Sequence, residues 1–547
     1  MATVGRRRRN PPRVVGAPAG ARIRTRLRLG PGEEAALREI GQFNGRLYRR
    51  ELAARIAQGT LDRTRQADYR ADRKRALTAE TSSRWAGAIT RSVEDQYQSG
   101  MRALAAHARS LDSAVATLAA RCTLAPNERD GKVAGYRDTA ERFAKTRRLA
   151  ALRVVAERAR RNLAEGRPSI VVGGKQLWRN RNHLADVPMS EAGWRQQWDA
   201  ARMFLTADGE AGKVGGNETI RVAPETRRLR VKVPAALADR FGTHLEIAAP
   251  VTFCHRSTEW TGRIAARQAV RYDIVFDPTR DRWYLDASWS LAPTPTVPLT
   301  AIRTGPVLGV DLNAGHLAIC VLDRYGNPVG EPATIALPGH GLSSSRRDGH
   351  LRAALTALCD QAVLTGCTAI VIEDLDFADA RGTGRETMGR GRRGKRFRRV
   401  VATIPTRRFR ERLRAIATRL DIAVVAVDPA YTSKVGAKHW RTPLQEQTQT
   451  SDRAVTVHHG AAVAIGRRGL GVKLSRHSSG PRHAQRSVAG QPPSLARATA
   501  QRRVACEKPC PALDPLGRPD RSGSKHHTPA AKTVRAATER YPLSLTD

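Results

Sequence analysis

Two carboxylates stand at the ends of apolar runs in the second half of the chain. Asp311 closes VLGVD at residues 307–311, and Glu373 closes AIVIE at residues 369–373. A buried strand accepts an acid mainly at its end, where a site can form just outside the sheet. Because strands joined by hairpins or by a single helix tend to be neighbours, we expect the two acids to face each other at one sheet edge. Such a pair repels unless a cation lies between its members.

The chemistry that such a pair suits is metal-dependent hydrolysis of a phosphodiester. Carboxylate oxygens prefer Mg²⁺ or Mn²⁺, and two such ions about 3.5 to 4 Å apart can stabilise both the attacking and the leaving oxygen. Alternatively, each acid only caps the turn after its strand, which is the simpler interpretation for one acid but not for two. Sugar kinases and actin-like ATPases also begin with a strand that ends in Asp, but no second Gly-rich phosphate loop follows here.

The overall charge indicates a polyanionic partner. The 547 residues include 95 Lys and Arg against 51 Asp and Glu, which gives a formal net charge of +44. A charge of this size exceeds what solubility needs and is typical of proteins that bind nucleic acid. An anionic membrane surface is the alternative, but no segment approaches the roughly 20 apolar residues of a spanning helix. We therefore expect no membrane partner.

Cysteine usage and the first residues predict a cytoplasmic protein. The seven cysteines are scattered and form no disulfide framework, as in a reducing compartment. The opening MATVGRRRRNPPRVV carries charge without a following apolar segment, so it is not a secretory signal. We expect a protein of the bacterial cytoplasm that is associated with the nucleoid.

Periodicity and composition divide the chain into blocks of different fold class. Helical spacing comes first, short alternating runs with turn signals follow, and strands then alternate with helices. The prediction is a multidomain protein with α, β and α/β parts. We expect a basic disordered tail at 1–19, a strand at 20–31, a helical domain at 32–165, a β-rich domain at 166–300, an α/β domain at 301–467 and a basic disordered tail at 468–547.

Several segments resemble the TnpB (OrfB) transposon proteins and the related type V CRISPR effectors. VLGVDLNAGHLAIC (307–320) resembles their first RuvC motif, and TAIVIEDLDF (368–377) resembles their second. VAVDPAYTSKVGAKHW (425–440) looks like the stretch that follows the second motif. ARIRTRLRLGPGEEAALREI (21–40) resembles their opening strand and first helix, and RWYLDASWSL (282–291) the strand before RuvC. The resemblance covers about residues 20–470.

This resemblance implies an RNA-guided DNA endonuclease. It implies an RNase H-like (RuvC) nuclease domain at 301–467, a β-barrel wedge domain built from 20–31 and 166–300, and a helical recognition domain at 32–165. In such proteins the chain reads duplex shape and a short flanking motif, while base pairing reads the sequence. Asp311 and Glu373 would be the first two metal ligands. The implied cofactors are Mg²⁺ (or Mn²⁺) and a guide RNA, the partners are that RNA and the target DNA, and we expect a monomer.

The third RuvC motif departs from the family pattern. The family places an Asp before an Ala-rich helix, whereas TSDRAVTVHHGAAVAIGRRG (450–469) has His458 or His459 in that place. Asp452 lies six residues before His458 and would have to reach in from a preceding loop. Imidazole can bind a metal or accept a proton, so Asp452, His458 and His459 are all candidates for the third ligand and for catalysis. Alternatively, the two histidines only open a helix.

The zinc ribbon of the family is missing. No Cys lies between Ser433 and Ser451, where the family has two CxxC pairs. Cys506 and Cys510, with His526 and His527, have poor spacing for a zinc site. We expect no structural zinc.

A basic loop after Glu373 is the candidate nucleic-acid contact. Residues 381–399 hold nine Lys and Arg against one Glu. The alternative is a disordered basic linker. As a cover for the substrate strand, the loop would use Arg390, Arg392, Arg393, Lys395, Arg396, Arg398 and Arg399.

Two other functions remain open on the sequence. The altered third motif favours an RNA-guided DNA-binding protein that silences its target without cleavage. A degenerate transposon remnant with unspecific RNA affinity is the weaker alternative.

Overall fold

The structure, a computed structural model, describes residues 10–131, 133–339, 341–342, 344–375, 406–448 and 454–475. The described residues form a mixed α/β protein with two compact units. The first unit combines residues 10–19 with those from 291 onward, and we call it the α/β unit. The second contains residues 20–290, and we call it the α+β unit.

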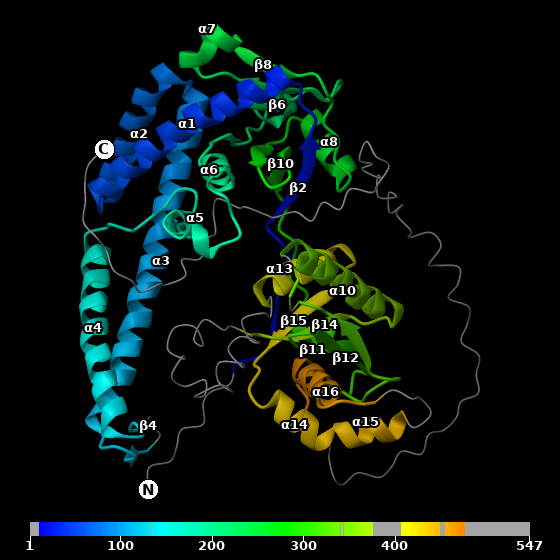
Figure 1. Ribbon diagram of the computed structural model, residues 1–547. Helices are drawn as coiled ribbons and strands as arrows, with labels where there is room; N and C mark the ends of the chain where they lie inside the picture. The colour runs from blue at the N-terminus through cyan, green and yellow to red at the C-terminus, as the bar shows by residue number, and fades with distance from the viewer. Residues whose placement is uncertain are drawn as a thin grey trace, which may run out of the picture. The chain divides into compact units, whose positions relative to one another are not determined.

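A six-stranded sheet is the centre of the α/β unit (Figure 1). Its strands lie in the order β1, β15, β14, β11, β12, β13. β14 pairs in parallel with both β11 and β15, whereas β12 is antiparallel to β11 and to β13. The carboxyl ends of β11, β14 and β15 therefore meet at one sheet edge. The strand bounds are β1 (Arg13–Val14), β11 (Val307–Leu312), β12 (His316–Leu322), β13 (Ala333–Ala336), β14 (Ala369–Glu373) and β15 (Ala423–Val427).

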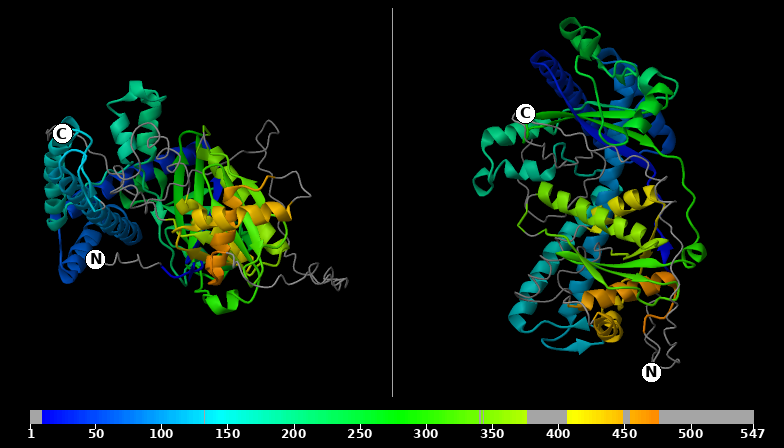
Figure 2. Two further views of the ribbon diagram at one scale, coloured as in Figure 1. Left: turned by 90° about the horizontal axis from the view of Figure 1, so that it is seen from below. Right: turned by 90° about the vertical axis from the view of Figure 1, so that its right-hand side faces the viewer.

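Helices cover both faces of this sheet (Figures 1 and 2). α10 (Ser344–Leu364) and α13 (Thr406–Arg419) pack on one face. α14 (Thr432–His439), α15 (Arg441–Gln447) and α16 (Val457–Leu470) belong to the other. A short helix, α9 (Leu299–Ile302), precedes β11.

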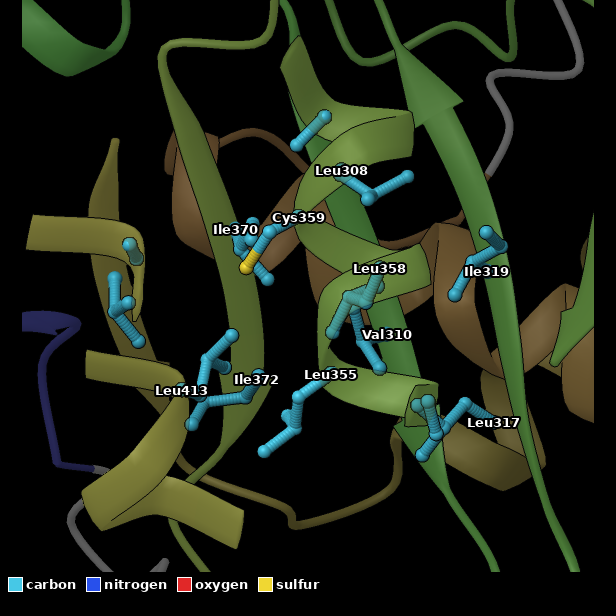
Figure 3. Close-up of a cluster of buried hydrophobic side chains, with 14 of the residues drawn as sticks. Leu308, Val310, Leu317, Ile319, Leu355, Leu358, Cys359, Ile370, Ile372 and Leu413 are labelled. Carbon is cyan, nitrogen blue, oxygen red and sulfur yellow. The ribbon is translucent and has the colours of Figure 1, made fainter. Parts of the chain in front are cut away.

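Each face has its own apolar core, because successive residues of a strand point to opposite sides. Figure 3 shows the core beneath α10, where Leu355 lies near Val310 and Ile372 of the strands. The second core lies beneath α16. Asp311 and Glu373 follow Val310 and Ile372 directly, so both acids are on the α16 face.

Glycine lets α16 lie close to β11. A Cβ added at Gly309 would stand 2.2 Å from the carbonyl oxygen of Ala462, so a larger residue does not fit there. On the helix, a Cβ added at Gly466 would stand 2.3 Å from the side chain of Leu322. This close packing fixes the rotation of α16 about its own axis, and with it the residues that face the sheet.

Residues 13–15 differ from the disordered tail expected at 1–19, of which residues 1–9 lie outside the described part of the chain. Residues 13–14 form β1, which pairs antiparallel with β15. Val14 packs against the core beneath α16, and Val15 packs against the core beneath α10. The packing of the two valines stabilises the segment as an outer strand beside β15, although its arginines and prolines indicated a tail.

The last described helix extends beyond the boundary expected at residue 467. α16 runs to Leu470, and Gly471 ends it with a φ of 78°, a left-handed conformation that favours glycine. The residues after 475 lie outside the described part of the chain.

The α+β unit contains long helices followed by short strands. Its helices are α1 (Pro31–Gln58), α2 (Arg63–Glu80), α3 (Ser83–Thr123), α4 (Thr139–Ala164), α5 (Lys175–Asn180), α6 (Glu191–Ala200), α7 (Ala238–Phe241) and α8 (Ser257–Ala265). Its strands are β2 (Gly20–Leu27), β3 (Arg129–Asp130), β4 (Val133–Ala134), β5 (Thr206–Ala207), β6 (Ile220–Val222), β7 (Leu229–Lys232), β8 (His244–Ile247), β9 (Arg271–Asp277) and β10 (Arg282–Ser290).

These strands form three separate sheets rather than one barrel. A four-stranded sheet has the order β2, β10, β9, β5, a three-stranded sheet has the order β6, β7, β8, and β3 pairs with β4. Within the described ranges the unit therefore shows no closed barrel of the kind that the resemblance implies. Among the helices in these ranges, none combines the length and the apolar character that a membrane crossing requires.

Candidate functional site

The two acids expected at one sheet edge do come together. β11 and β14 pair in parallel with Val310 opposite Ile372, so Asp311 and Glu373 are the next residues on both strands. Both lie on the face that α16 covers. Their closeness has an electrostatic effect, because the charge of Asp311 is among the causes that raise the pKa of Glu373. We call this group of strand ends the acidic edge.

Asp311 is held by two side chains on the same oxygen. Nδ1 of His458 lies 2.9 Å from Oδ2 of Asp311, and Nδ2 of Asn313 donates to that oxygen at 3.0 Å. The Asp311 side chain is only 7% exposed, whereas that of His458 is 40% exposed. The hydrogen bond to Asp311 raises the pKa of His458, although partial burial acts the other way. Because a carboxylate only accepts hydrogen bonds, Nδ1 of His458 carries the proton.

Glu373 lies in surroundings that disfavour its charged form. Burial raises its pKa to about 7, a hydrogen bond from the Thr432 hydroxyl opposes the shift, and the charge of Asp311 adds to it. Thr432 is itself completely buried at the start of α14. A raised carboxyl pKa means that the charged form is disfavoured, here mainly by burial and further by the like charge of Asp311.

A third acid, Asp428, follows the neighbouring strand. β15 pairs in parallel with β14 so that Glu373 lies opposite Val427, and Asp428 comes next. Its charge also raises the pKa of Glu373. Asp428 was not among the site residues expected from the sequence, although IAVVAVD ends on an acid in the same way as the other two runs.

Arg468 is a second residue that the sequence did not single out. It comes from the last turn of α16, and its guanidinium donates to the carbonyl oxygens of Asp428 and Ala430. The side chain is largely buried, and its charge lowers the pKa of Glu373. Arg468 therefore holds the turn after β15 and offsets part of the negative charge of the acidic edge. No sequence pattern marks this role, since it depends on where the helix lies.

The two candidate histidines have different surroundings. His459 is 4% exposed, its Nε2 lies 2.9 Å from Oγ1 of Thr334, and its Nδ1 accepts the backbone N–H of Thr456 at 3.1 Å. It therefore caps the start of α16 and does not contact Asp311. Burial, followed by the nearby charge of His316, lowers the pKa of His459.

His316 joins the site from β12. Its ring packs edge-on against that of His458, with centroids 5.1 Å apart. Burial, and next the charge of His458, lowers the pKa of His316. The sequence alone did not single out this residue, because it meets His458 only through the antiparallel return of β12.

The other candidates lie outside the described residues. These are the proposed third carboxylate Asp452 and the loop residues Arg390, Arg392, Arg393, Lys395, Arg396, Arg398 and Arg399. Cys506, Cys510, His526 and His527 lie outside them too.

The donors of the acidic edge suit a divalent cation. Asp311 and Glu373 supply hard oxygen atoms from adjacent strands, and the charge of Asp311 adds to the burial that raises the pKa of Glu373. Within the described ranges, no three His, Cys, Asp or Glu side chains are grouped as a complete metal site. A Mg²⁺ ion commonly uses one or two protein carboxylates and completes its shell with water and substrate phosphates, so the acid pair fits such an ion.

Comparisons with known proteins add little to this geometry. No family model matches the chain, and no curated protein matches it. Among solved structures, the T. thermophilus RuvC in complex with Holliday junction substrate matches at 14% sequence identity with a TM-score of 0.20, over 30% of this chain and 92% of that chain. A TM-score this low supports neither a shared fold nor a shared activity.

Proposed function

We propose that the protein is an RNA-guided DNA endonuclease of TnpB type, which hydrolyses phosphodiesters with Mg²⁺ or Mn²⁺. The observation that carries the proposal is that Asp311 and Glu373 end adjacent parallel strands on one face of the sheet. The order of the sheet, an antiparallel trio β11–β12–β13 followed by parallel β14 and β15, supports an RNase H-like (RuvC) domain.

In this proposal each residue of the acidic edge has a separate task. Asp311 and Glu373 hold the metal, and Thr432 orients Glu373 by donating to its carboxylate. A divalent ion bound there would neutralise charge on the phosphodiester and make water a better nucleophile. His458, with its proton on Nδ1 toward Asp311, presents its other nitrogen as a ligand or proton acceptor. We assign the third position to His458 rather than His459, because His459 is used in capping α16.

Charge and sequence support a guide RNA and a DNA target as partners. The net charge of +44 suits a long polyanion, and the two RuvC-like motifs coincide with the strands that carry the acids. We assign residues 32–165 to guide recognition and residues 20–31 with 166–300 to a wedge domain. The basic loop at 381–399 would neutralise phosphates of the bound strands.

Cleavage of a matched target tests this proposal. The full-length chain, loaded with RNA transcribed from beside its own gene, should cut double-stranded DNA that matches the guide in Mg²⁺ or Mn²⁺. Asp311→Ala should abolish cutting but keep target binding, because the acid supports chemistry rather than base pairing. An absence of cutting by the unaltered protein in both metals would refute the nuclease proposal.

One observation favours a second function, RNA-guided binding that silences a target without cleavage. Where the family has a third carboxylate, His458 stands and is bonded to Oδ2 of Asp311. One neutral imidazole leaves a metal pair less balanced than a third carboxylate would. Asp311→Ala separates the two functions in cells, since a silencing protein affects its target equally with and without Asp311, whereas a nuclease loses cleavage of the target.

A further inference from the structure

The segment Asn10–Val15 closes one side of the α/β sheet. β1 pairs with β15, and the backbone N–H of Val15 then donates to the carbonyl of Val424 at 2.8 Å. Val14 and Val15 pack into the cores on opposite faces. The segment is therefore an integral strand of the sheet, and it lies beside the strand that leads to Asp428.

Arg13 reaches the carboxylate that follows Glu373. Its Nε and Nη2 donate to Oδ2 of Asp374 at 3.1 and 2.8 Å. From α13, Nη2 of Arg410 lies 2.7 Å from the other oxygen of Asp374. Two arginines from distant parts of the chain thus hold one carboxylate between them.

The same stretch of backbone is tied to β15. The N–H of Asp374 donates to the carbonyl of Val427 at 2.7 Å. At the end of β15, Oδ2 of Asp428 accepts the N–H of Asn10 at 3.2 Å. The N-terminal segment therefore contacts the residues that follow both β14, which lies beside β11, and β15, which lies beside β14.

The contacts of Arg13 restrict geometry more than they add stability. The Arg13 side chain is 54% exposed and that of Asp374 is 29% exposed. Ion pairs this exposed add little to the free energy of unfolding. A carboxylate held on both oxygens by two guanidinium groups has little freedom, however, and the adjacent backbone shares that restriction.

We propose that residues 10–15 are a positioning element of the acidic edge, with Arg13 as its positioning residue. By holding Asp374, Arg13 fixes the point where β14 ends and so keeps Glu373 beside Asp311. Through Asn10, the segment steadies Asp428 in the same way. This role rests on the proposed function only where it concerns binding of a divalent ion, since the ordering of the strand ends is independent of it.

The test compares Arg13→Ala and Arg13→Lys with Arg407→Ala in the full-length protein. Arg407 is a matched control, because it is 67% exposed and pairs with Glu411 on the surface of α13. The readouts are hydrogen exchange of the amides of residues 373–375 and 423–428, the dissociation constant for Mn²⁺, and the denaturant midpoint.

We expect a local effect in Arg13→Ala. Exchange at both strand ends should become about tenfold faster, and Mn²⁺ should bind about tenfold more weakly, as on loss of a residue that supports a metal ligand. In Arg13→Lys, the exchange rates and the Mn²⁺ affinity should lie between those of Arg13→Ala and those of the unaltered protein. The reason is that lysine keeps the positive charge but lacks the planar guanidinium. The denaturant midpoint of Arg13→Ala should equal that of Arg407→Ala.

The outcomes separate this role from the proposed function. If the unaltered protein binds no Mn²⁺, the metal proposal fails and exchange alone decides the role of Arg13. Exchange rates in Arg13→Ala equal to those in Arg407→Ala would overturn the positioning element. Faster exchange with unchanged Mn²⁺ affinity would overturn the link from Arg13 to Glu373.

Discussion

At the residue scale, the pKa of Glu373 links the acidic edge to stability. Burial raises this pKa from 4.5 to about 7, against the hydrogen bond from Thr432 and with the charge of Asp311. Since the folded protein binds the proton more tightly than the unfolded chain, stability without metal falls as the pH rises from about 4.5 to 7. Full ionisation costs up to about 3 kcal/mol.

Replacing Glu373 by Gln should remove this pH dependence. In a chelating buffer, Glu373→Gln should exceed the unaltered protein in stability at pH 8, by up to about 3 kcal/mol, and match it at pH 4.5. Chemical denaturation at the two pH values measures the difference. Glu411→Gln, on the exposed surface of α13, should show no such change. A Glu373→Gln effect of the same size at both pH values would rule out the proposed cause.

The two histidines of α16 should respond differently to substitution. His458→Asp places a third carboxylate beside Asp311, so Mn²⁺ affinity should rise about tenfold, which is about 1.4 kcal/mol. His459→Ala should leave that affinity unchanged, but it should lower the free energy of unfolding by about 1 to 2 kcal/mol, because it removes a helix cap. Calorimetric titration and denaturation measure the two effects. Loss of Mn²⁺ affinity in His459→Ala alone would reverse the assignment.

The sequence predicts that Asp311 and Glu373 lie at strand ends, because each acid follows a run of apolar residues, and the structure places both at the ends of adjacent strands. The sequence was not able to choose between His458 and His459, since adjacent helix residues point about 100° apart and the rotation of α16 comes from its contact with Gly309. His316 was not predicted either, because its contact with His458 depends on the pairing of β12 with β11.

At the element scale, the close contact between α16 and β11 should make Gly309 intolerant of substitution. A Cβ there meets the backbone oxygen of Ala462, which cannot rotate away. Gly309→Ala should therefore destabilise the α/β unit by about 1 to 3 kcal/mol and weaken Mn²⁺ binding, because α16 carries His458. Gly466→Ala should cost less, since its Cβ meets the flexible side chain of Leu322.

Gly349 provides the control for this prediction. It lies in α10, and a Cβ at this position has nothing within 4 Å. Gly349→Ala should leave stability unchanged or raise it by up to about 1 kcal/mol, because alanine favours a helix. Thermal unfolding of the three alanine variants gives the comparison. Equal losses at residues 309 and 349 would show that the packing of α16 is not the cause.

The longer elements follow from periodicity, and the shortest does not. β11, β14 and β15 are apolar runs bounded by turns, so the sequence predicts them. β1 has only two residues, too few to show a period, and it is a strand because the edge of β15 offers it a partner. Predicting β1 requires knowing that β15 offers it a free edge, and β15 lies about 400 residues later in the chain.

At the scale of the whole molecule, the net charge of +44 predicts strongly salt-dependent binding of nucleic acid. Each arginine of the basic loop that neutralises a phosphate should contribute about 0.9 to the slope of log K against log salt. Replacing Arg390, Arg392 and Arg393 by Gln should thus make the slope shallower by up to about 3. Filter binding or fluorescence anisotropy at several salt concentrations measures it.

Paired surface arginines are the control for the salt prediction. Arg75 and Arg160 already face Asp72 and Asp112, so their replacement by Gln should change the slope less. A slope that is unaffected by the loop substitutions would mean that residues 390–393 do not bind phosphates.

The periodicity of a strand does not indicate which other strand it pairs with. In the sequence, several helices and shorter strands lie between β2 and β10. In the structure, β2 and β10 pair directly with each other. The alternation of apolar and polar residues in β2 indicates which of its faces is buried. It does not indicate which strand lies next to it. For the same reason, periodicity does not indicate whether the sheets close into the barrel that the resemblance implies.

The proposed function depends above all on strand-end acids of one sheet edge holding a divalent ion together. The decisive experiment is titration of the full-length, RNA-free protein with Mn²⁺ by calorimetry. We expect the unaltered protein to bind Mn²⁺, and Glu411→Gln to bind it equally well. Asp311→Ala and Glu373→Ala should each weaken binding by more than about 100-fold, which is the upper range for loss of a residue that only supports a ligand. Equal Mn²⁺ binding by all four proteins would contradict this metal site.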